Sequence, residues 1–126
     1  MTAINDTYLL EQCMYKLIDK HFHDASYLVD IYRCFHNITY LTGMGQELDM
    51  LISDNPREEF SLDNYTMSRY KAIVKYKTAY YSFYFPITLG MILTGVNDKK
   101  LFSEVETILL KMGEYFQVMN SINLSK

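Results

Sequence analysis

The architecture of this chain depends on KAIVKYKTAYYSFYFPITLGMILTG, which runs from Lys71 to Gly95. Its first half is basic and rich in tyrosine, whereas the residues from Thr78 to Asn97 carry no formal charge. Pro86 lacks an amide donor and crowds the preceding turn, so we expect a helix that kinks, or two helices that meet, near residue 85. The second half is apolar on nearly every side, which predicts a helix buried in a protein core or in a membrane.

A membrane-spanning helix is the alternative, because about 20 uncharged residues can cross a bilayer. Serine, threonine, glycine, proline and tyrosine dilute this segment, and the charges that follow it give no signal of sidedness. We therefore expect no membrane span and interpret the segment as the central helix of an all-α protein.

The composition indicates one globular domain over residues 1–126, since 49% of the residues are hydrophobic and 15% are aromatic. A net charge of −3 predicts no general attraction to nucleic acid. Cys13 and Cys34 have no metal-binding spacing, and we expect two free thiols. The first residues lack the pattern of a secretory signal, so we expect a cytoplasmic protein.

Apolar residues at steps of three and four predict four or five helices. Gly43 and Gly45 interrupt the second of them, which predicts a bend or close packing against another backbone. The expected order is a first helix from Asn5 or Asp6 to Phe22, a second that starts at Asp24 or Ser26 and runs to Ser53, a loop over residues 54–62, a central helix capped by Asp63 or Asn64, a stop at Gly95 and Asn97, and a last helix from about Asp98.

Polar groups on shared helix faces are the candidates for a binding site. Gln46 and Asp49 are three residues apart and could hold a hydrated cation or a polar ligand, or form an ordinary solvated face. Lys77 and Tyr81 are four residues apart, which predicts an ammonium beside a phenol.

His21 and His23 are a weaker candidate, for a metal site. Only Phe22 separates them, and side chains two positions apart point to different faces of a helix, so we expect a solvated helix end there.

Four segments, in preserved order, resemble the farnesyl diphosphate synthase family of trans-isoprenyl diphosphate synthases: AINDTYLLEQCMYKL, GQELDML, RYKAIVKYKTAYYSFYFP and ILLKMGEYFQ. The resemblance implies part of an all-α prenyltransferase bundle with a kinked central helix. It also implies the family reaction, in which an Mg²⁺-dependent enzyme condenses isopentenyl diphosphate with dimethylallyl or geranyl diphosphate for isoprenoid biosynthesis.

The resemblance assigns residues to a substrate pocket. Lys77 matches the lysine that holds the allylic diphosphate, and Gln117 matches the glutamine that opens the family's second aspartate-rich motif. The other matched positions are Gln46, Asp49, Thr78 and Tyr81.

The second aspartate-rich motif departs from the family pattern. Asn120, Ser121 and Leu124 stand where the family has aspartates, and none of them supplies the negative charge that Mg²⁺ needs from its ligands. The first motif would lie upstream of the AIND segment. We therefore expect that Mg²⁺ is not held stably and that this chain alone is not an active synthase.

Three interpretations stay open. The chain is a truncated paralogue, a splice form or an incomplete gene model; or it is a non-catalytic module that pairs with itself or with a full-length synthase subunit; or it retains weak diphosphate binding through Lys77 and Tyr81. We also expect a partial bundle to leave apolar groups of the central helix partly wet. These are Tyr80, Phe83, Phe85, Ile87 and Met91.

Overall fold

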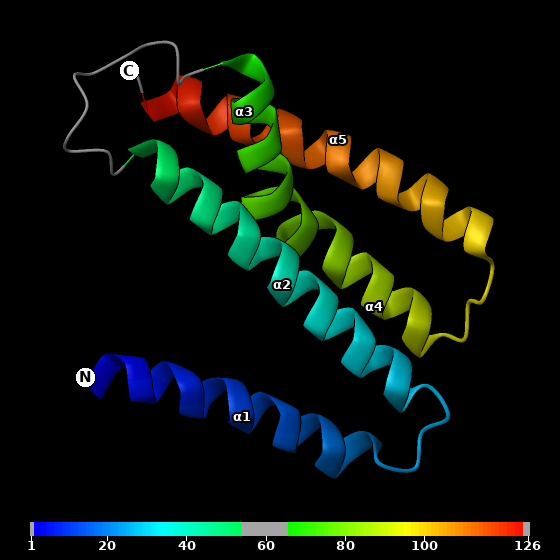
Figure 1. Cartoon of the computed structure of the whole chain (residues 1–126). Helices are drawn as coiled ribbons and strands as arrows, with labels where there is room; N and C mark the ends of the chain where they lie inside the picture. The colour runs from blue at the N-terminus through cyan, green and yellow to red at the C-terminus, as the bar shows by residue number, and fades with distance from the viewer. Residues whose placement is uncertain (1, 54–65, 125–126) are drawn as a thin grey trace.

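The computed structural model describes the backbone of residues 2–53 and 66–124, with side chains for residues 2–52 and 66–120. Every regular element in these ranges is helical, which confirms the all-α prediction. The elements are α1 (Thr2–Phe22), α2 (Leu28–Ser53), α3 (Met67–Ile73), η2 (Val74–Tyr84), α4 (Phe85–Leu93) and α5 (Lys99–Leu124). Because α3, η2 and α4 follow one another without a break, the described chain forms four helical rods (Figure 1).

The central rod changes its helix type at both ends of η2. η2 is a π-helix of 11 residues, in which backbone hydrogen bonds reach five residues instead of four. The last of these joins the Phe85 amide to the Tyr80 carbonyl, and α4 then begins with Pro86 in its first turn. The predicted change near residue 85 is confirmed, and Figure 1 shows the rod turning between α3 and α4. The π-helix itself was not predicted.

α2 and α5 pack on either side of η2, and this is where the core lies (Figure 1). The buried apolar residues of α2 and η2 include Ile31 and Ile38 of α2 with Val74, Ala79 and Tyr80 of η2. The Tyr80 hydroxyl donates a hydrogen bond of 2.7 Å to Glu106 Oε1 of α5. Burial and this hydrogen bond raise the pKa of the Tyr80 phenol.

Gly45 provides the close backbone packing that the sequence predicted. A Cβ at this position would lie 2.5 Å from the carbonyl carbon of Tyr76 and 2.7 Å from the Cα of Lys77. Gly43 differs, because a Cβ there would meet nothing within 4 Å. Close packing is therefore confirmed for one glycine of the pair only.

The helix ends partly follow the predictions. Gly95 has φ of +78°, and Asp98 Oδ1 accepts from the amides of Lys100 and Leu101, so the stop and the last cap are confirmed. The predicted start of the first helix was wrong, because α1 begins at Thr2 instead of at Asn5 or Asp6.

α3 begins after Thr66, whose hydroxyl accepts from the Arg69 amide at 3.3 Å. The predicted caps Asp63 and Asn64 and the predicted loop over residues 54–62 lie outside the described residues.

An aromatic side chain of α1, Tyr15, contacts three rings of α2. Tyr15 stacks on His36 of α2 with ring centroids 5.0 Å apart, and it also contacts the rings of Tyr32 and Phe35. Ile18 is the buried residue of α1. The N-terminal half of α1 diverges from α2 in Figure 1, and Ile4 is 78% exposed there.

The expected exposure of the central rod is found at some positions and not at others. Ile87 is exposed, and Phe83, Phe85 and Met91 are partly exposed. The expectation for Tyr80 was wrong, because this residue is buried and its hydroxyl donates to Glu106 of α5. Within residues 2–53 and 66–124, no helix is both long and apolar enough to cross a membrane.

Both cysteines are free, as predicted. Cys13 is exposed on α1, whereas Cys34 of α2 is half-buried. Burial raises the pKa of the Cys34 thiol to about 11, so this group is almost entirely protonated at neutral pH.

We expect Tyr80→Phe to lower the free energy of unfolding by about 1–3 kcal/mol, because Glu106 loses a donor in a partly buried setting. Urea denaturation followed by circular dichroism measures the change. Tyr81→Phe is the matched control, since Tyr81 is 53% exposed and its side chain makes no hydrogen bond among the described residues; we expect a change within about 0.5 kcal/mol. Equal effects of the two substitutions would contradict the role of the Glu106 hydrogen bond.

Candidate functional site

A cavity of about 570 Å³ lies where the end of α2, the start of the central rod and the end of α5 meet. Four of the six residues predicted for the binding site line it: Asp49 of α2, Lys77 and Thr78 of η2, and Gln117 of α5. They come from three helices and are separated by up to 68 positions in the chain, from residue 49 to residue 117. The fold thus gathers most of the predicted polar set at one place.

Lys77 and Asp49 form an ion pair in the wall of this cavity. The ammonium donates a hydrogen bond to Asp49 Oδ2, and the two side chains are 36% and 31% exposed. Pairing at this depth is stronger than at an open surface, because water screens the two charges less. The pair therefore fixes the ammonium of Lys77 at the cavity instead of leaving it free in solvent.

Gln46 and Tyr81 do not line this cavity. Gly45 and Asp49 of α2, one helical turn apart, both contact Lys77 of η2, whereas Gln46 is exposed and does not line the cavity. Tyr81 follows Lys77 within a π-helix, whose wider turn changes the angular relation that an α-helix would give. The expectation that both residues share the cavity of Lys77 is thus not met among the described residues.

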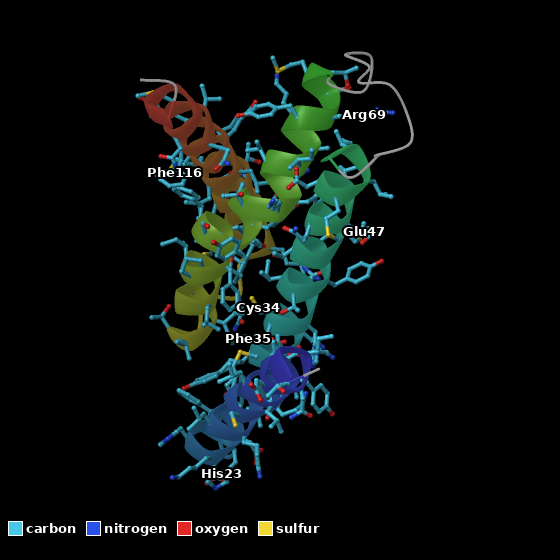
Figure 2. The ribbon with its side chains drawn as sticks, turned by 90° about the vertical axis from the view of Figure 1, so that its left-hand side faces the viewer. His23, Cys34, Phe35, Glu47, Arg69 and Phe116 are labelled. Carbon is cyan, nitrogen blue, oxygen red and sulfur yellow. The ribbon has the colours of Figure 1, made fainter. Side chains whose placement is uncertain are left out.

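Arg69 also lines the cavity, and the sequence did not single it out. It lies near the start of α3, at the end of the central rod where Figure 2 labels it. Its eight-residue separation from Lys77, about two helical turns, is the signal that could have identified it. Arg69 and Lys77 contribute two positive charges to the described lining, and Asp49 contributes one negative charge.

The rest of the described lining is largely apolar. It consists of Ile52, Met67, Tyr70, Ile73 and Val74, with Thr66 at the start of α3. Cationic groups beside an apolar wall suit a ligand that has an anionic head and a hydrocarbon part.

A second cavity, of about 650 Å³, lies between the first half of α2, α4 and the start of α5. Cys34 and Tyr84 line it, and burial raises the pKa of both groups. They are neutral at pH 7 and offer neither a thiolate nor a phenolate. None of the predicted site residues lies there, so the first cavity is the better candidate.

The structure can be compared with the two sequence-based considerations of a metal site, at His21 and His23 and at the second aspartate-rich motif. His23 follows the end of α1 and its Nε2 lies 2.8 Å from Asp24 Oδ2 at the surface. Across the described part of the chain, no three histidine, cysteine, aspartate or glutamate side chains come together in a way that could hold a metal ion. Asn120 is half-buried on α5, whereas the side chains of Ser121 and Leu124 lie outside the described set.

Comparison with known proteins gives a consistent result. The family model described as polyprenyl synthetase matches residues 1–122. The chain is 48% identical to farnesyl diphosphate synthase of Dictyostelium discoideum and 43% identical to farnesyl pyrophosphate synthase of Candida albicans, over 94% of its length in both cases. It is 41% identical to the human farnesyl pyrophosphate synthase over 95% of its length. These matches span 30%, 33% and 28% of the respective relatives, so the chain covers about a third of their length.

Proposed function

This chain belongs to the polyprenyl synthetase family, and from that membership we propose that the Lys77 cavity binds the diphosphate group of an isoprenoid substrate. One observation carries the proposal. Lys77 lines a cavity together with Thr78, Asp49 and Gln117, although these residues lie on three different helices.

The chemistry of the lining supports a diphosphate ligand. An ammonium binds phosphate oxygens as a compact charge, and its hydrogen bonds to a charged acceptor are stronger than those between neutral groups. Thr78 and Gln117 offer further polar groups, and the apolar wall suits the hydrocarbon chain of an isoprenoid. A diphosphate would compete with the Asp49 carboxylate for the ammonium of Lys77.

The described residues do not fit a resident magnesium cluster. Mg²⁺ is bound in proteins chiefly by carboxylates and substrate phosphates, and it gives up its water reluctantly. The described lining of the cavity offers one carboxylate, Asp49, which is already paired with Lys77. At the second motif of the family, Asn120, Ser121 and Leu124 supply an amide, a hydroxyl and a hydrocarbon.

We therefore infer that this chain alone does not condense isopentenyl diphosphate with dimethylallyl or geranyl diphosphate. The relatives are named as synthases of farnesyl diphosphate. By the resemblance of its motifs, Lys77 matches the family's diphosphate lysine, whereas Asn120, Ser121 and Leu124 stand at positions where the family has aspartates. Stabilisation of the departing diphosphate is the largest catalytic contribution in such chemistry, and here the groups that would provide it through Mg²⁺ are missing from the second motif.

We expect Lys77→Ala to weaken the binding of inorganic pyrophosphate by about 10- to 100-fold, because one charged hydrogen-bond donor is lost. Isothermal titration calorimetry without divalent metal measures the affinity. Asp49→Asn is expected to tighten binding, since its carboxylate no longer competes for the ammonium. Lys100→Ala is the control of equal charge, because Lys100 is exposed on α5 and pairs with Glu104 away from the cavity. An unchanged affinity in Lys77→Ala would refute diphosphate binding at this site.

We expect the purified chain, given Mg²⁺, dimethylallyl diphosphate and isopentenyl diphosphate, to form no geranyl or farnesyl diphosphate above trace level. The farnesyl diphosphate synthase of Dictyostelium discoideum under the same conditions provides the positive control. Steady formation of either product, measured by mass spectrometry of the quenched reaction, would overturn the inference that the chain is inactive alone.

A second candidate function is pairing with a synthase subunit. The observation that favours it is the α5 patch, which we define as Phe83, Ile108, Met112, Tyr115, Phe116 and Met119. Ile108 is 60% exposed and Tyr115 is 67% exposed, although such groups are ordinarily covered. Because the chain spans about a third of its relatives, helices of a full-length synthase are the proposed cover.

We expect the chain to co-purify with a tagged full-length farnesyl diphosphate synthase when the two are expressed together. Met112→Glu should abolish this co-purification by placing a charge in the α5 patch, whereas Ser103→Glu, which adds the same charge to α5 outside the patch, should not. Loss of co-purification in both variants, or in neither, would count against the α5 patch as the contact.

A further inference from the structure

The π-helix η2 is held between two close backbone approaches, one from each flanking helix. Gly45 contacts it from α2, and Gly113 contacts it from α5. Figure 2 shows Glu47 of α2 and Phe116 of α5 on opposite sides of the segment that descends from Arg69. The two glycines therefore press on η2 from different directions.

On the α2 side, the contact is between backbones. A Cβ on Gly45 would lie 2.5 Å from the carbonyl carbon of Tyr76 and 2.7 Å from the Cα of Lys77. Backbone atoms cannot rotate away as the end of a flexible side chain can, so any larger residue at position 45 must push α2 and η2 apart. Gly45 is also buried.

On the α5 side, Gly113 likewise allows a close approach to η2, at the turn that contains Ala79. A Cβ there would lie 2.7 Å from the Cα of Ala79 and 3.2 Å from the Cδ2 of Phe83. Ala79 is completely buried, so the space at this contact is fully used. The residues that the two glycines touch all belong to η2.

The Gly45 contact lies one turn of α2 before Asp49, on the same helix face. Gly45 touches the backbone of Lys77, and Asp49 pairs with the ammonium of the same residue. The backbone separation that Gly45 allows thus sets the distance over which the ammonium reaches the carboxylate and the cavity.

We propose that Gly45 is a positioning residue for Lys77, and that Gly113 holds the π-helix against it from the opposite side. The consequence for the ligand rests on the diphosphate function proposed above. Gly45 would act through Lys77 without touching the ligand, because it does not line the cavity.

The experiment compares Gly45→Ala with Gly43→Ala in the full chain. Gly43 is the matched control, since it lies on the same helix and a Cβ there meets nothing within 4 Å. We expect Gly45→Ala to weaken binding of inorganic pyrophosphate by about tenfold, the effect of a misplaced charged hydrogen bond. We also expect it to speed hydrogen exchange of the amides of residues 74–84 by about tenfold or more. Gly43→Ala should change neither quantity.

A double-mutant cycle separates positioning from general destabilisation. In the Lys77→Ala background, Gly45→Ala should cost no further pyrophosphate affinity, because the group that it positions is gone. An equal loss in both backgrounds would overturn the proposal, as would a Gly45→Ala variant that matches Gly43→Ala in affinity and exchange.

Two further outcomes have defined meanings. If Lys77→Ala leaves pyrophosphate binding unchanged, the proposed function fails, while the exchange rates of residues 74–84 still test the glycine contacts on their own. If Gly45→Ala does not fold, Gly113→Ala provides the test from the α5 side. It is expected to accelerate the same amides, and unchanged exchange in that variant would overturn the proposal.

Discussion

The contact that the rest of the structure depends on is the approach of α2 to η2 at Gly45, where one backbone lies directly on another. This approach brings the last turns of α2 beside Lys77, and it allows Asp49 to pair with the ammonium. The cavity forms at the same junction, with α5 closing its remaining side through Gln117. The approach of α2 to η2 therefore determines both how these helices pack and where Lys77 lies in the cavity.

Much of this fold follows from local sequence rules. The spacing of apolar residues predicted the helices, Pro86 predicted where α4 begins, and Gly95 and Asp98 marked the last connection. These features succeed because each depends on a property of one residue or one turn. The π-helix was missed because apolar spacing and Pro86 mark a helix and its kink, but they do not distinguish backbone hydrogen bonds to the fifth residue from those to the fourth.

The candidate site also contains residues that the sequence predicted correctly and residues that it did not. Asp49, Lys77, Thr78 and Gln117 were predicted, and the fold brings them together across three helices. Gln46 was placed with Asp49 because three residues nearly complete an α-helical turn, yet the narrow face that meets η2 includes Gly45 and leaves Gln46 outside. Arg69 was missed because its spacing of eight residues from Lys77 was not weighed as a sign of a shared helix face. The spacing of residues along one helix identifies those that share a face. Which of these faces lines a cavity depends on the helix that packs against it.

The contrast between the two thiols has a practical consequence. Burial raises the pKa of the Cys34 thiol, so little of it is thiolate at neutral pH, whereas Cys13 is exposed on α1. A maleimide dye added at neutral pH would therefore select Cys13 in the unaltered protein. The native chain thus carries an attachment point for a fluorophore on α1, away from the residues that line the cavity of Lys77.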